Sequence, residues 1–500
     1  MLTGTANCMA NDVLPQAVPG LTRQNKILFT TLGVVTILSV LLAVGLDKLW
    51  ILVIPFIVLT VYASIIDLRL VFFLLFATIP FSTEVSFKNG LATDFPVEFF
   101  VIYLMFAYLA YLLSNVKNIS SRFFRHPLTL LLIFHTLWIG VTCLHSYNIV
   151  VSFKFFLAKI WYVVTFYFLA GMVIKHLKDL RILFWCVFIP TFITVCIVLF
   201  RHAEFNFDFK HVNHLFYPFY RNHVDYACLL ALLFPYIFYH TLWYQKWSNK
   251  WLFLVFSLVF IFVAIYLSYT RAAILALVIA AFALYAIKYR FIKPAMILAF
   301  GLLIGLILYL GKNNKYLGLA PDYNKTITHQ NYEDLLEATY KLEDISTMER
   351  VYRWVAGFQM FNREPWFGFG PGNFYFNYKS YTVSSFQTYV SRNPEKSGIH
   401  SYYLMTLVEQ GIVGLSVFML LIFYALAKAE VVYHSLKDRE SRFFLLSGVM
   451  SFVVILSLLL INDMVETDKV GPFFFLSLVI ITNMDLKVQE EKSSAKSESE

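Results

Sequence analysis

The chain has 500 residues, of which 59% are hydrophobic and only 14% are charged. Because soluble domains carry about 25% charged residues, this composition excludes an ordinary soluble domain and predicts a polytopic membrane protein. The net charge of +9 would suggest nucleic-acid binding in a soluble protein. In a membrane protein, basic cytoplasmic loops explain it, so we expect no nucleic-acid partner.

Residues 1–26 are polar and lack the basic start and apolar core of a signal peptide, so we expect a cytoplasmic N-terminal segment. Hydrophobic stretches of about 18–20 residues follow, each long enough to cross a bilayer as a helix. They lack the alternation of a membrane β-barrel, so the predicted fold class is an all-α polytopic membrane protein with about 12–14 transmembrane helices. The predicted spans are 27–46, 49–66, 70–81, 97–114, 128–145, 155–174, 181–200, 226–243, 251–268, 272–287, 294–310, 402–427, 443–461 and 470–484.

The distribution of Lys and Arg predicts the orientation of these spans. With the N-terminus in the cytoplasm, the cytoplasmic connections carry about twice as many basic residues as the outer ones, so both termini are predicted to be cytoplasmic. The predicted organisation is a first bundle of transmembrane helices over 27–310, one large outer loop over 311–400, C-terminal transmembrane helices over 401–486 and a disordered tail over 487–500.

The large outer loop is expected to contain helices. Its stretch "YEDLLEATYKLEDISTMERVYRWVAGFQMF" has apolar residues at helical spacing, and the turn cluster "GFGPGNF" follows. The cluster lacks the GK[ST] ending of a phosphate-binding P-loop, so we do not predict a nucleotide site.

Two arginines lie at predicted outer helix ends. Arg271, in "YLSYTRAAILAL", stands between two apolar runs, and an arginine within a membrane helix costs roughly 2.5–3.5 kcal/mol. We interpret it as an anion-binding group facing a cavity; the alternative is an arginine that extends to the interface. Arg221, in "YPFYRNHVDYA", either binds the same anion or is a solvated loop residue, and His223 beside it either orients a ligand or pairs with it.

His400 begins "HSYYLMTLVEQGIVGL" on the same predicted outer side. A neutral imidazole can take a proton from a hydroxyl group, although a histidine at a helix start can also be a structural or capping residue. Glu409 follows about two and a half turns later, where we expect a helix–helix hydrogen bond, with catalysis as the alternative.

The predicted outer loops also contain several acids. Asp94 and Glu98 lie in "TDFPVEFF", and three more acids lie in "INDMVETDK". They can pair with the arginines or bind sugar hydroxyls. No His, Cys or Asp stands at metal-ligand spacing with them, so we expect no metal or other cofactor.

Together these residues predict an outer site for an anionic, lipid-linked substrate. Guanidinium groups suit a diphosphate because they stay charged and donate two hydrogen bonds side by side. A neutral histidine would activate an attacking hydroxyl, and the donor itself would supply the energy of a glycosyl transfer.

The stretch "ERVYRWVAGFQMFNREPWFGFGPGNFYFNY" followed by "HSYYLMTLVEQGIVGL" resembles the signature region of the O-antigen ligase and Wzy-type polymerase superfamily. "YTRAAILAL" and "YRNHVDYACLLALLFP" resemble two earlier motifs of that family, so the resemblance covers about residues 90–475. It implies a GT-C-like membrane glycosyltransferase of the bacterial inner membrane that uses neither a nucleotide sugar nor an essential metal.

The resemblance also implies roles for particular residues. Arg221 and Arg271 resemble the family's diphosphate-binding arginines, His400 resembles its proposed base, and Arg353 in the Arg-Trp pair is a further candidate. The family often has Asn where this chain has Ser401. The implied partners are an undecaprenyl-diphosphate-linked glycan as donor, a glycan, lipid A–core or protein hydroxyl as acceptor, and the bilayer.

Several functions stay open on the sequence alone. A ligase that transfers the glycan to lipid A–core, a polymerase of O-antigen or exopolysaccharide units and a protein O-glycan ligase share their donor chemistry. A flippase or other transporter is a different class. A transporter is expected to have ionisable residues near the bilayer midplane and paired repeats, whereas this chain gathers its charges at predicted outer helix ends.

Overall fold

A computed structural model describes residue 31 and the ranges 34–39, 41–42, 53–86, 92–115, 121–320, 345–388, 391–393 and 397–497. The chain divides into two compact units, residues 1–71 and 72–500. In the first unit, α2 (Val53–Ile66) and the first residues of α3 (Leu68–Thr78) are described. The predicted segment 1–26 and most of the predicted span 27–46 lie outside the described residues.

The second unit is helical. Among the described residues, 11 helices are long and apolar enough to cross a membrane, which confirms the predicted class of an all-α polytopic membrane protein. They are α4 (Val97–Ser114), α6 (Pro127–Leu144), α7 (Ile149–Val163) with η4 (Val164–Leu169) and α8 (Ala170–Val173), α9 (Leu177–Ala203), α11 (His223–Thr241), α12 (Asn249–Leu267), α13 (Arg271–Lys288), α14 (Ile292–Gly311), α18 (Tyr402–Ser435), α19 (Arg439–Leu458) and α20 (Gly471–Ser497).

Further elements lie between these helices, and all except the 19-residue α16 are short. They are η2 (Ile79–Phe81), β1 (Thr83–Ser86), β2 (Ala92–Phe95), α5 (Ser121–Phe124), η5 (Phe209–His211), α10 (Val212–Leu215), η6 (Lys312–Leu319), α16 (Ile345–Arg363), α17 (Phe374–Asn377), η7 (Tyr378–Tyr381) and η8 (Ser384–Phe386). The antiparallel pair β1–β2 is a feature that the sequence analysis missed, because four-residue strands leave little periodicity to detect.

Side chains cap the N-termini of several long helices. The side chain of Asn222 accepts a hydrogen bond from the backbone of Asp225 at the start of α11, and Ser248 does the same at the start of α12. Ser401 caps α18 by accepting from the backbone of Leu404. Serine and asparagine are both favourable N-cap residues, so Ser401 can replace the asparagine that is frequent in the resembling family.

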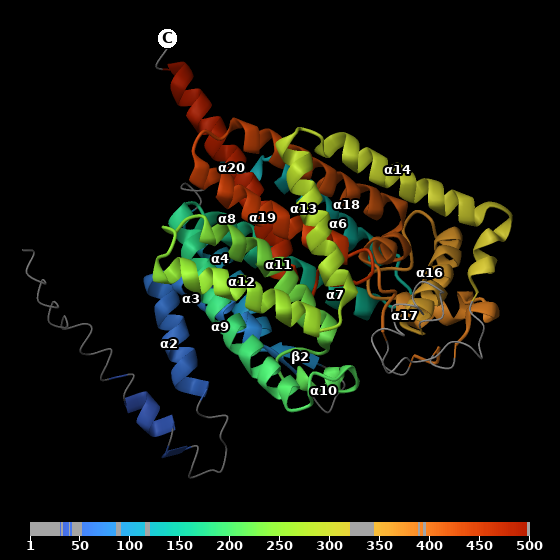
Figure 1. Ribbon diagram of the computed structural model, residues 1–500, viewed down its shortest axis with the longest axis horizontal. Coiled ribbons are helices and arrows are strands. Elements are labelled where there is room, and N and C mark those ends of the chain that lie inside the picture. Colours follow the sequence, from blue (N-terminus) through green and yellow to red (C-terminus); the bar gives the residue numbers. More distant parts are fainter. Residues whose placement is uncertain are drawn as a thin grey trace, which may run out of the picture. The chain divides into compact units, whose positions relative to one another are not determined.

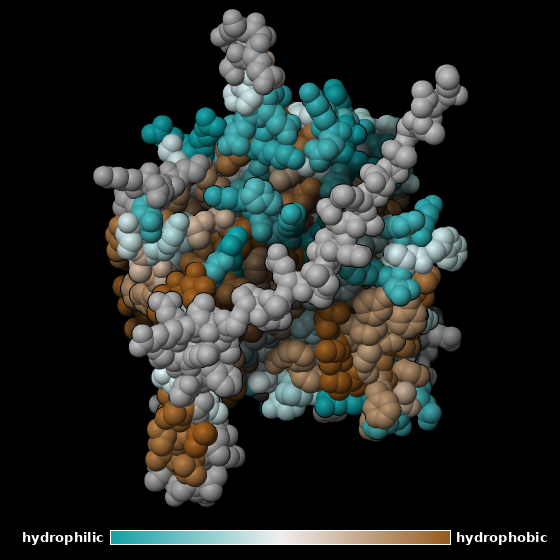
Figure 2. Space-filling model, turned by 90° about the vertical axis from the view of Figure 1, so that its left-hand side faces the viewer, coloured by the Kyte–Doolittle hydropathy of each residue, from teal (hydrophilic) through white to brown (hydrophobic). Residues whose placement is uncertain are grey.

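The core of the second unit is built around α19, which packs against α11 and α20, and α18 packs against α19 and α20 (Figure 1). Most residues of α11, α19 and α20 are buried, whereas fewer than a third are buried in the spans of α12 and α13, and in α14 Ile292 is the single buried residue. A helix that is apolar on every side and exposed suits a lipid environment. Figure 2 shows hydrophobic side chains over a broad area of one face, with hydrophilic side chains gathered above them.

Successive spans run in alternate directions, so their ends gather at two levels. We call the level at which α4, α7, α11, α13, α18 and α20 begin the loop end, because the connection 312–401 starts and finishes there. We call the other level the opposite end. Within the connection, α16 forms part of the expected helical stretch, and residues 332–344 of that stretch lie outside the described residues.

The expected disorder of 487–500 is wrong for the described residues, because α20 continues to Ser497. Charged side chains support this exposed end of the helix. Lys487 Nζ lies 3.8 Å from Glu491 Oε1 one turn later, and Glu490 Oε1 lies 3.6 Å from an Arg122 guanidinium nitrogen.

Candidate functional site

The starts of α11 and α13 meet at the loop end. The Thr270 hydroxyl donates a hydrogen bond to the His223 carbonyl oxygen at 3.4 Å, so the first residues of the two helices, His223 and Arg271, are neighbours in the fold. Helix N-termini carry a partial positive charge. An arginine at one such terminus beside a second terminus is a suitable place for an anion.

Helix α16 adds a second arginine to this group. The charge of Arg350 acts on both His223 and His400, and its guanidinium donates a hydrogen bond to the Ser346 hydroxyl one turn earlier at 3.0 Å. The sequence analysis missed Arg350 and selected Arg353. The two arginines lie three residues apart, on neighbouring positions of the α16 surface, so the sequence does not distinguish their surroundings.

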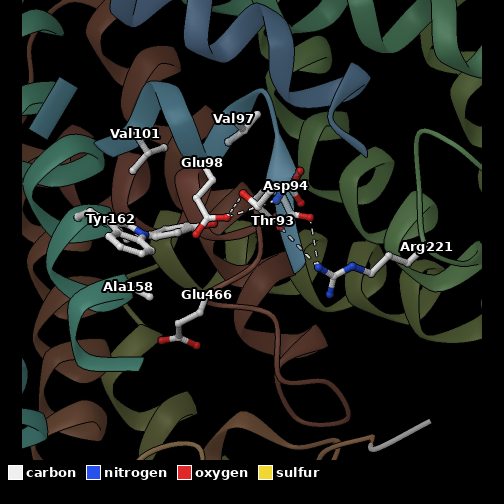
Figure 3. A pocket seen from close by; sticks show the side chains of 11 residues that line it. Thr93, Asp94, Val97, Glu98, Val101, Ala158, Tyr162, Arg221 and Glu466 are labelled. Atoms are coloured by element: carbon white, nitrogen blue, oxygen red, sulfur yellow. Dashed lines mark hydrogen bonds and ion pairs between the residues drawn. The ribbon is translucent and has the colours of Figure 1, made fainter. Parts of the chain in front are cut away.

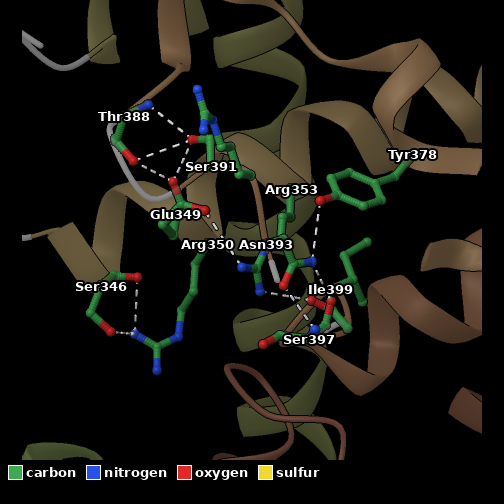
Figure 4. Close-up of polar contacts among 12 residues, drawn as sticks. Ser346, Glu349, Arg350, Arg353, Tyr378, Thr388, Ser391, Asn393, Ser397 and Ile399 are labelled. Carbon is green, nitrogen blue, oxygen red and sulfur yellow. Dashed lines mark hydrogen bonds and ion pairs between the residues drawn. The ribbon is translucent and has the colours of Figure 1, made fainter. Parts of the chain in front are cut away.

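Arg353 is buried and holds the chain just before His400 (Figure 4). Its guanidinium donates to the Gly398 carbonyl oxygen at 3.1 Å and lies 3.5 Å from the Glu349 carboxylate. The neighbouring Trp354 Nε1 donates to the Ile399 carbonyl oxygen at 3.1 Å. Arg353 and Trp354 therefore position the loop 397–399.

His400 has a left-handed backbone, with φ of +55°. A non-glycine residue in this region is uncommon and is found most often where function or tight packing requires it. Gly398 permits the close approach of the 459–470 connection, because a Cβ atom there would lie 2.2 Å from Asp463 Oδ2. His400 Nδ1 lies 3.9 Å from Asp463 Oδ1, which is too long for a hydrogen bond.

Burial, followed by the charges of Arg353 and Arg350, lowers the pKa of His400 to about 3. The side chain is 32% exposed, so water screens part of this effect. The imidazole is neutral at physiological pH and has a nitrogen free of a proton. Burial also raises the pKa of Asp463, so the low pKa of His400 does not reflect a strong ion pair between them.

Glu409 lies in α18 and does not reach His400. Its carboxylate accepts the backbone N–H groups of Gly372 at 2.8 Å and Phe374 at 3.0 Å. The expected helix–helix hydrogen bond is therefore replaced by contacts to the "GFGPGNF" turn. A buried carboxylate with two such donors fixes the turn against the helix.

Two glycines allow the turn to come this close to the helix. Gly411 has φ of +69°, and a Cβ atom there would lie 2.0 Å from the Trp366 carbonyl oxygen. Gly368 also has φ of +69°, and its Cβ would lie 2.6 Å from the Val408 carbonyl oxygen. These contacts give a physical reason for the glycine in the "EQG" part of the motif.

Arg221 bridges the two strands of the β1–β2 hairpin. Glu84 and Asp94 stand opposite each other in the strand register, and like charges in that arrangement repel. Arg221 Nε lies 2.8 Å from Glu84 Oε2, and a terminal guanidinium nitrogen lies 3.2 Å from Asp94 Oδ1. The charge of Arg221 is therefore already balanced by two carboxylates.

Glu98 has a local role beside this hairpin. Its carboxylate accepts hydrogen bonds from the Thr93 hydroxyl and, at 3.3 Å, from the Asp94 backbone N–H. Burial and the charge of Asp468 raise the pKa of Asp94 to about 6, although Arg221 opposes this. The carboxylates around Arg221 are thus close enough to disfavour one another's ionisation.

Two adjoining cavities border this group and share Asp94, Arg221 and Asp468. The smaller, about 170 Å³, lies between α4 and α7 and also contacts Glu98 and Glu466 (Figure 3). The larger, about 530 Å³, lies between the hairpin, the residues before α11 and the 459–470 connection. Glu466 also forms an ion pair with Lys159, a buried residue of α7, whose Nζ lies 2.7 Å from Glu466 Oε1.

The structure thus divides the predicted site residues into three places. Arg271, His223 and His400 lie with Arg350, while Arg221, Asp94 and Glu98 lie at the hairpin. Arg353 and Glu409 support the loop and the turn. In the described part of the chain, no three His, Cys, Asp or Glu residues are arranged to hold a metal ion.

Comparison with protein families gives a match between residues 256–419 and the family described as O-antigen ligase. The match covers about a third of the chain, from within α12 to the first half of α18. No curated protein matches the chain. The match confirms the resemblance to the O-antigen ligase and Wzy-type polymerase superfamily.

Proposed function

Because residues 256–419 form an O-antigen ligase family domain, we propose that the protein transfers a glycan from undecaprenyl diphosphate to an acceptor hydroxyl. The reaction takes place on the periplasmic face of the bacterial inner membrane, with both termini in the cytoplasm. The acceptor is a sugar hydroxyl of lipid A–core, in keeping with the description of the matched family.

The observation that carries this proposal is the group of cations and histidines at the loop end. Arg271 begins α13, Arg350 acts on both His223 and His400, and two helix N-termini lie beside them. A diphosphate carries the negative charge that such a group would bind. Arg221 contributes to substrate binding from the neighbouring cavities.

In the proposed reaction, His400 accepts the proton of the acceptor hydroxyl while the hydroxyl oxygen attacks the anomeric carbon of the donor sugar. The bond from that carbon to the diphosphate oxygen breaks, and undecaprenyl diphosphate leaves with the electron pair. Arg271 and Arg350 stabilise the charge that develops on the leaving oxygen. His400 then releases its proton to water or to the diphosphate.

The low pKa of His400 in the free protein fits this sequence of events. Burial is the main cause of this low pKa and two arginine charges lower it further; a bound diphosphate would offset the arginine charges. The basicity of His400 would therefore rise when the donor is in place. The proton would be taken up only in the complex that can react.

The test uses the full-length protein in lipid nanodiscs with an undecaprenyl-diphosphate-linked glycan and lipid A–core. We expect His400→Ala to lower the transfer rate about 10²–10⁴-fold, the usual contribution of a general base. His145→Ala is the matched control, because His145 also lies at the loop end but its side chain is 57% exposed. Full transfer by His400→Ala would disprove the assignment.

The products of the same assay separate the related functions. Glycan attached to lipid A–core supports the ligase. A lengthened glycan that stays on undecaprenyl diphosphate would show a polymerase, and glycan on a protein hydroxyl would show a protein O-glycan ligase. Donor that stays chemically unchanged in this assay but is moved across the bilayer of proteoliposomes would show a transporter.

A further inference from the structure

The larger cavity at the β1–β2 hairpin has an acidic lining. It is bordered by Glu84, Asp94, Asp225 and Asp468, with Arg221 and Lys469 as its basic residues. Acids outnumber bases in this lining. A cavity with such a charge disfavours an anionic ligand.

Both basic residues of the lining already have partners. Arg221 contacts Glu84 and Asp94 as described above. Lys469 Nζ lies 3.3 Å from Asp468 Oδ2 and donates to the carbonyl oxygens of Ile79 and, at 2.9 Å, of Ser82. A diphosphate in this cavity would have to displace carboxylates from both cations.

The cavity also offers unused hydrogen-bonding capacity. Ser82 is 1% exposed and lines the cavity, and its hydroxyl has no hydrogen-bond partner among the described residues. A buried hydroxyl without a partner costs free energy unless a ligand or water supplies one. Carboxylates beside it accept hydrogen bonds from hydroxyl or amino groups.

Aromatic side chains complete the lining. Tyr217 is 69% exposed, and Phe219 lies beside it. Aromatic faces with neighbouring hydrogen-bond acceptors suit a sugar ring, which has an apolar face and a rim of hydroxyl groups. The cavity volume of about 530 Å³ lies within the usual range of small-molecule sites.

We propose that this cavity is a subsite for a sugar residue without acidic groups, either neutral or amine-bearing. The proposal rests on the proposed glycan transfer, since it assigns the cavity to a sugar of the donor or acceptor glycan. The residues that line the cavity all lie outside 256–419, whereas Arg271, Arg350 and His400 lie inside that range. Glycan selection is therefore built from parts of the chain that the family domain does not include.

The direct test measures binding without transfer, so its result is independent of the transferase proposal. The purified full-length protein in nanodiscs is titrated with glucosamine, N-acetylglucosamine, glucuronic acid and ethanolamine, and binding is followed by saturation-transfer NMR. We expect both amino-sugar probes to bind at least about tenfold more tightly than glucuronic acid, because the acidic lining repels its carboxylate; tenfold corresponds to about 1.4 kcal/mol. Glucuronic acid binding as tightly as N-acetylglucosamine would overturn the proposal, and so would ethanolamine binding as tightly as glucosamine.

A variant with altered charge locates the effect in this cavity. Glu84 is partly exposed, so Glu84→Gln is expected to fold, and it releases part of the Arg221 charge. We expect the preference for glucosamine over glucuronic acid to fall at least threefold. Glu440→Gln, which alters an exposed acid at the opposite end, is the control and should leave the ratio unchanged. An unchanged ratio in Glu84→Gln would contradict the proposal.

The transfer assay then identifies the source of the sugar. In Glu84→Gln, a raised KM for the lipid-linked donor assigns the cavity to the donor glycan, and a raised KM for lipid A–core assigns it to the acceptor. Both outcomes support a sugar subsite. Unchanged KM values for both substrates would reject it.

Discussion

The two ends of the second unit differ in how well their charged groups are paired. At the opposite end, oppositely charged groups pair closely: Lys428 Nζ lies 3.2 Å from Asp485 Oδ2, and His126 Nε2 lies 3.0 Å from the same oxygen. Arg181 pairs with Glu440 at 3.1 Å. These contacts join α6, α9, α18, α19 and α20 where the helices meet.

At the loop end, charged groups are held in less favourable states. His400 is kept neutral by burial and by two arginines, and burial and the charge of Asp468 raise the pKa of Asp94 to about 6. By contrast, at the opposite end burial would raise the pKa of Asp438, but hydrogen bonds from Ser441 and the charge of Lys487 outweigh it and lower that pKa.

The number of ion pairs at an end therefore does not indicate where the candidate functional site lies. The opposite end has well-matched pairs, which contribute to packing. The loop end collects groups with like charges, shifted pKa values and a left-handed histidine. Perturbed groups of this kind concentrate at functional sites.

The largest expected effect compares two arginines that each begin a spanning helix. Arg271 begins α13 at the loop end, and Arg439 begins α19 at the opposite end. We expect Arg271→Ala to lower the transfer rate about 10²–10³-fold, as for loss of one group that stabilises developing charge. Arg439→Ala should change it less than about twofold. Equal losses in the same transfer assay would remove the distinction between the ends.

The next effect concerns the turn that Glu409 holds. In Gly411→Ala, the added Cβ meets the Trp366 carbonyl oxygen at 2.0 Å, and we expect a loss of about 1–3 kcal/mol of stability. Gly305→Ala in α14 is the control, because a Cβ there meets nothing within 4 Å. That variant should be neutral or more stable. Thermal unfolding of both proteins in the same detergent checks this, and equal midpoints would be inconsistent with the close approach.

A smaller effect tests the link between α16 and His400. Arg353→Gln keeps a hydrogen-bond donor for the Gly398 carbonyl but removes a charge that lowers the pKa of His400. That pKa should rise, so the base becomes protonated at higher pH. The acid limb of the kcat/KM profile should move upward by up to about one pH unit, equivalent to 1.4 kcal/mol. Arg363→Gln, at the exposed end of α16, should leave the limb in place.

The smallest effect is expected at the opposite end. Arg122 and Glu490 are 3.6 Å apart and both more than half exposed. We expect Arg122→Ala to cost less than about 1 kcal/mol in stability and to leave transfer unchanged, because exposed ion pairs contribute little. A large loss of transfer would show that the comparison between the ends is too simple.

Hydropathy was sufficient to predict the spans from 97 onward, since helices such as α4 and α13 agree with the predicted ranges within a few residues. Alternation of the spans was sufficient to bring Arg271, His223 and His400 to one end. The sequence could not show that the charge of Arg350 acts on both histidines, because that depends on how α16 packs.

Contacts between segments far apart in the chain could not be predicted from the sequence either. The pairing of Arg221 with Glu84 and Asp94 requires the hairpin register, which two four-residue strands do not reveal. The contact of Glu409 with Gly372 and Phe374 requires the helix to break at Gly411. Each of these depends on a precise approach of two backbones.

The two hydrogen bonds before His400 determine that the loop becomes ordered during folding rather than on binding of a substrate. Arg353 and Trp354 hold the carbonyl groups of the consecutive residues Gly398 and Ile399, which restrains rotation of both peptide units. The conformational entropy of this segment is therefore lost when the protein folds. In the proposed reaction, the imidazole would already be oriented when the two substrates bind, and reaching the transition state would require little further ordering of the loop.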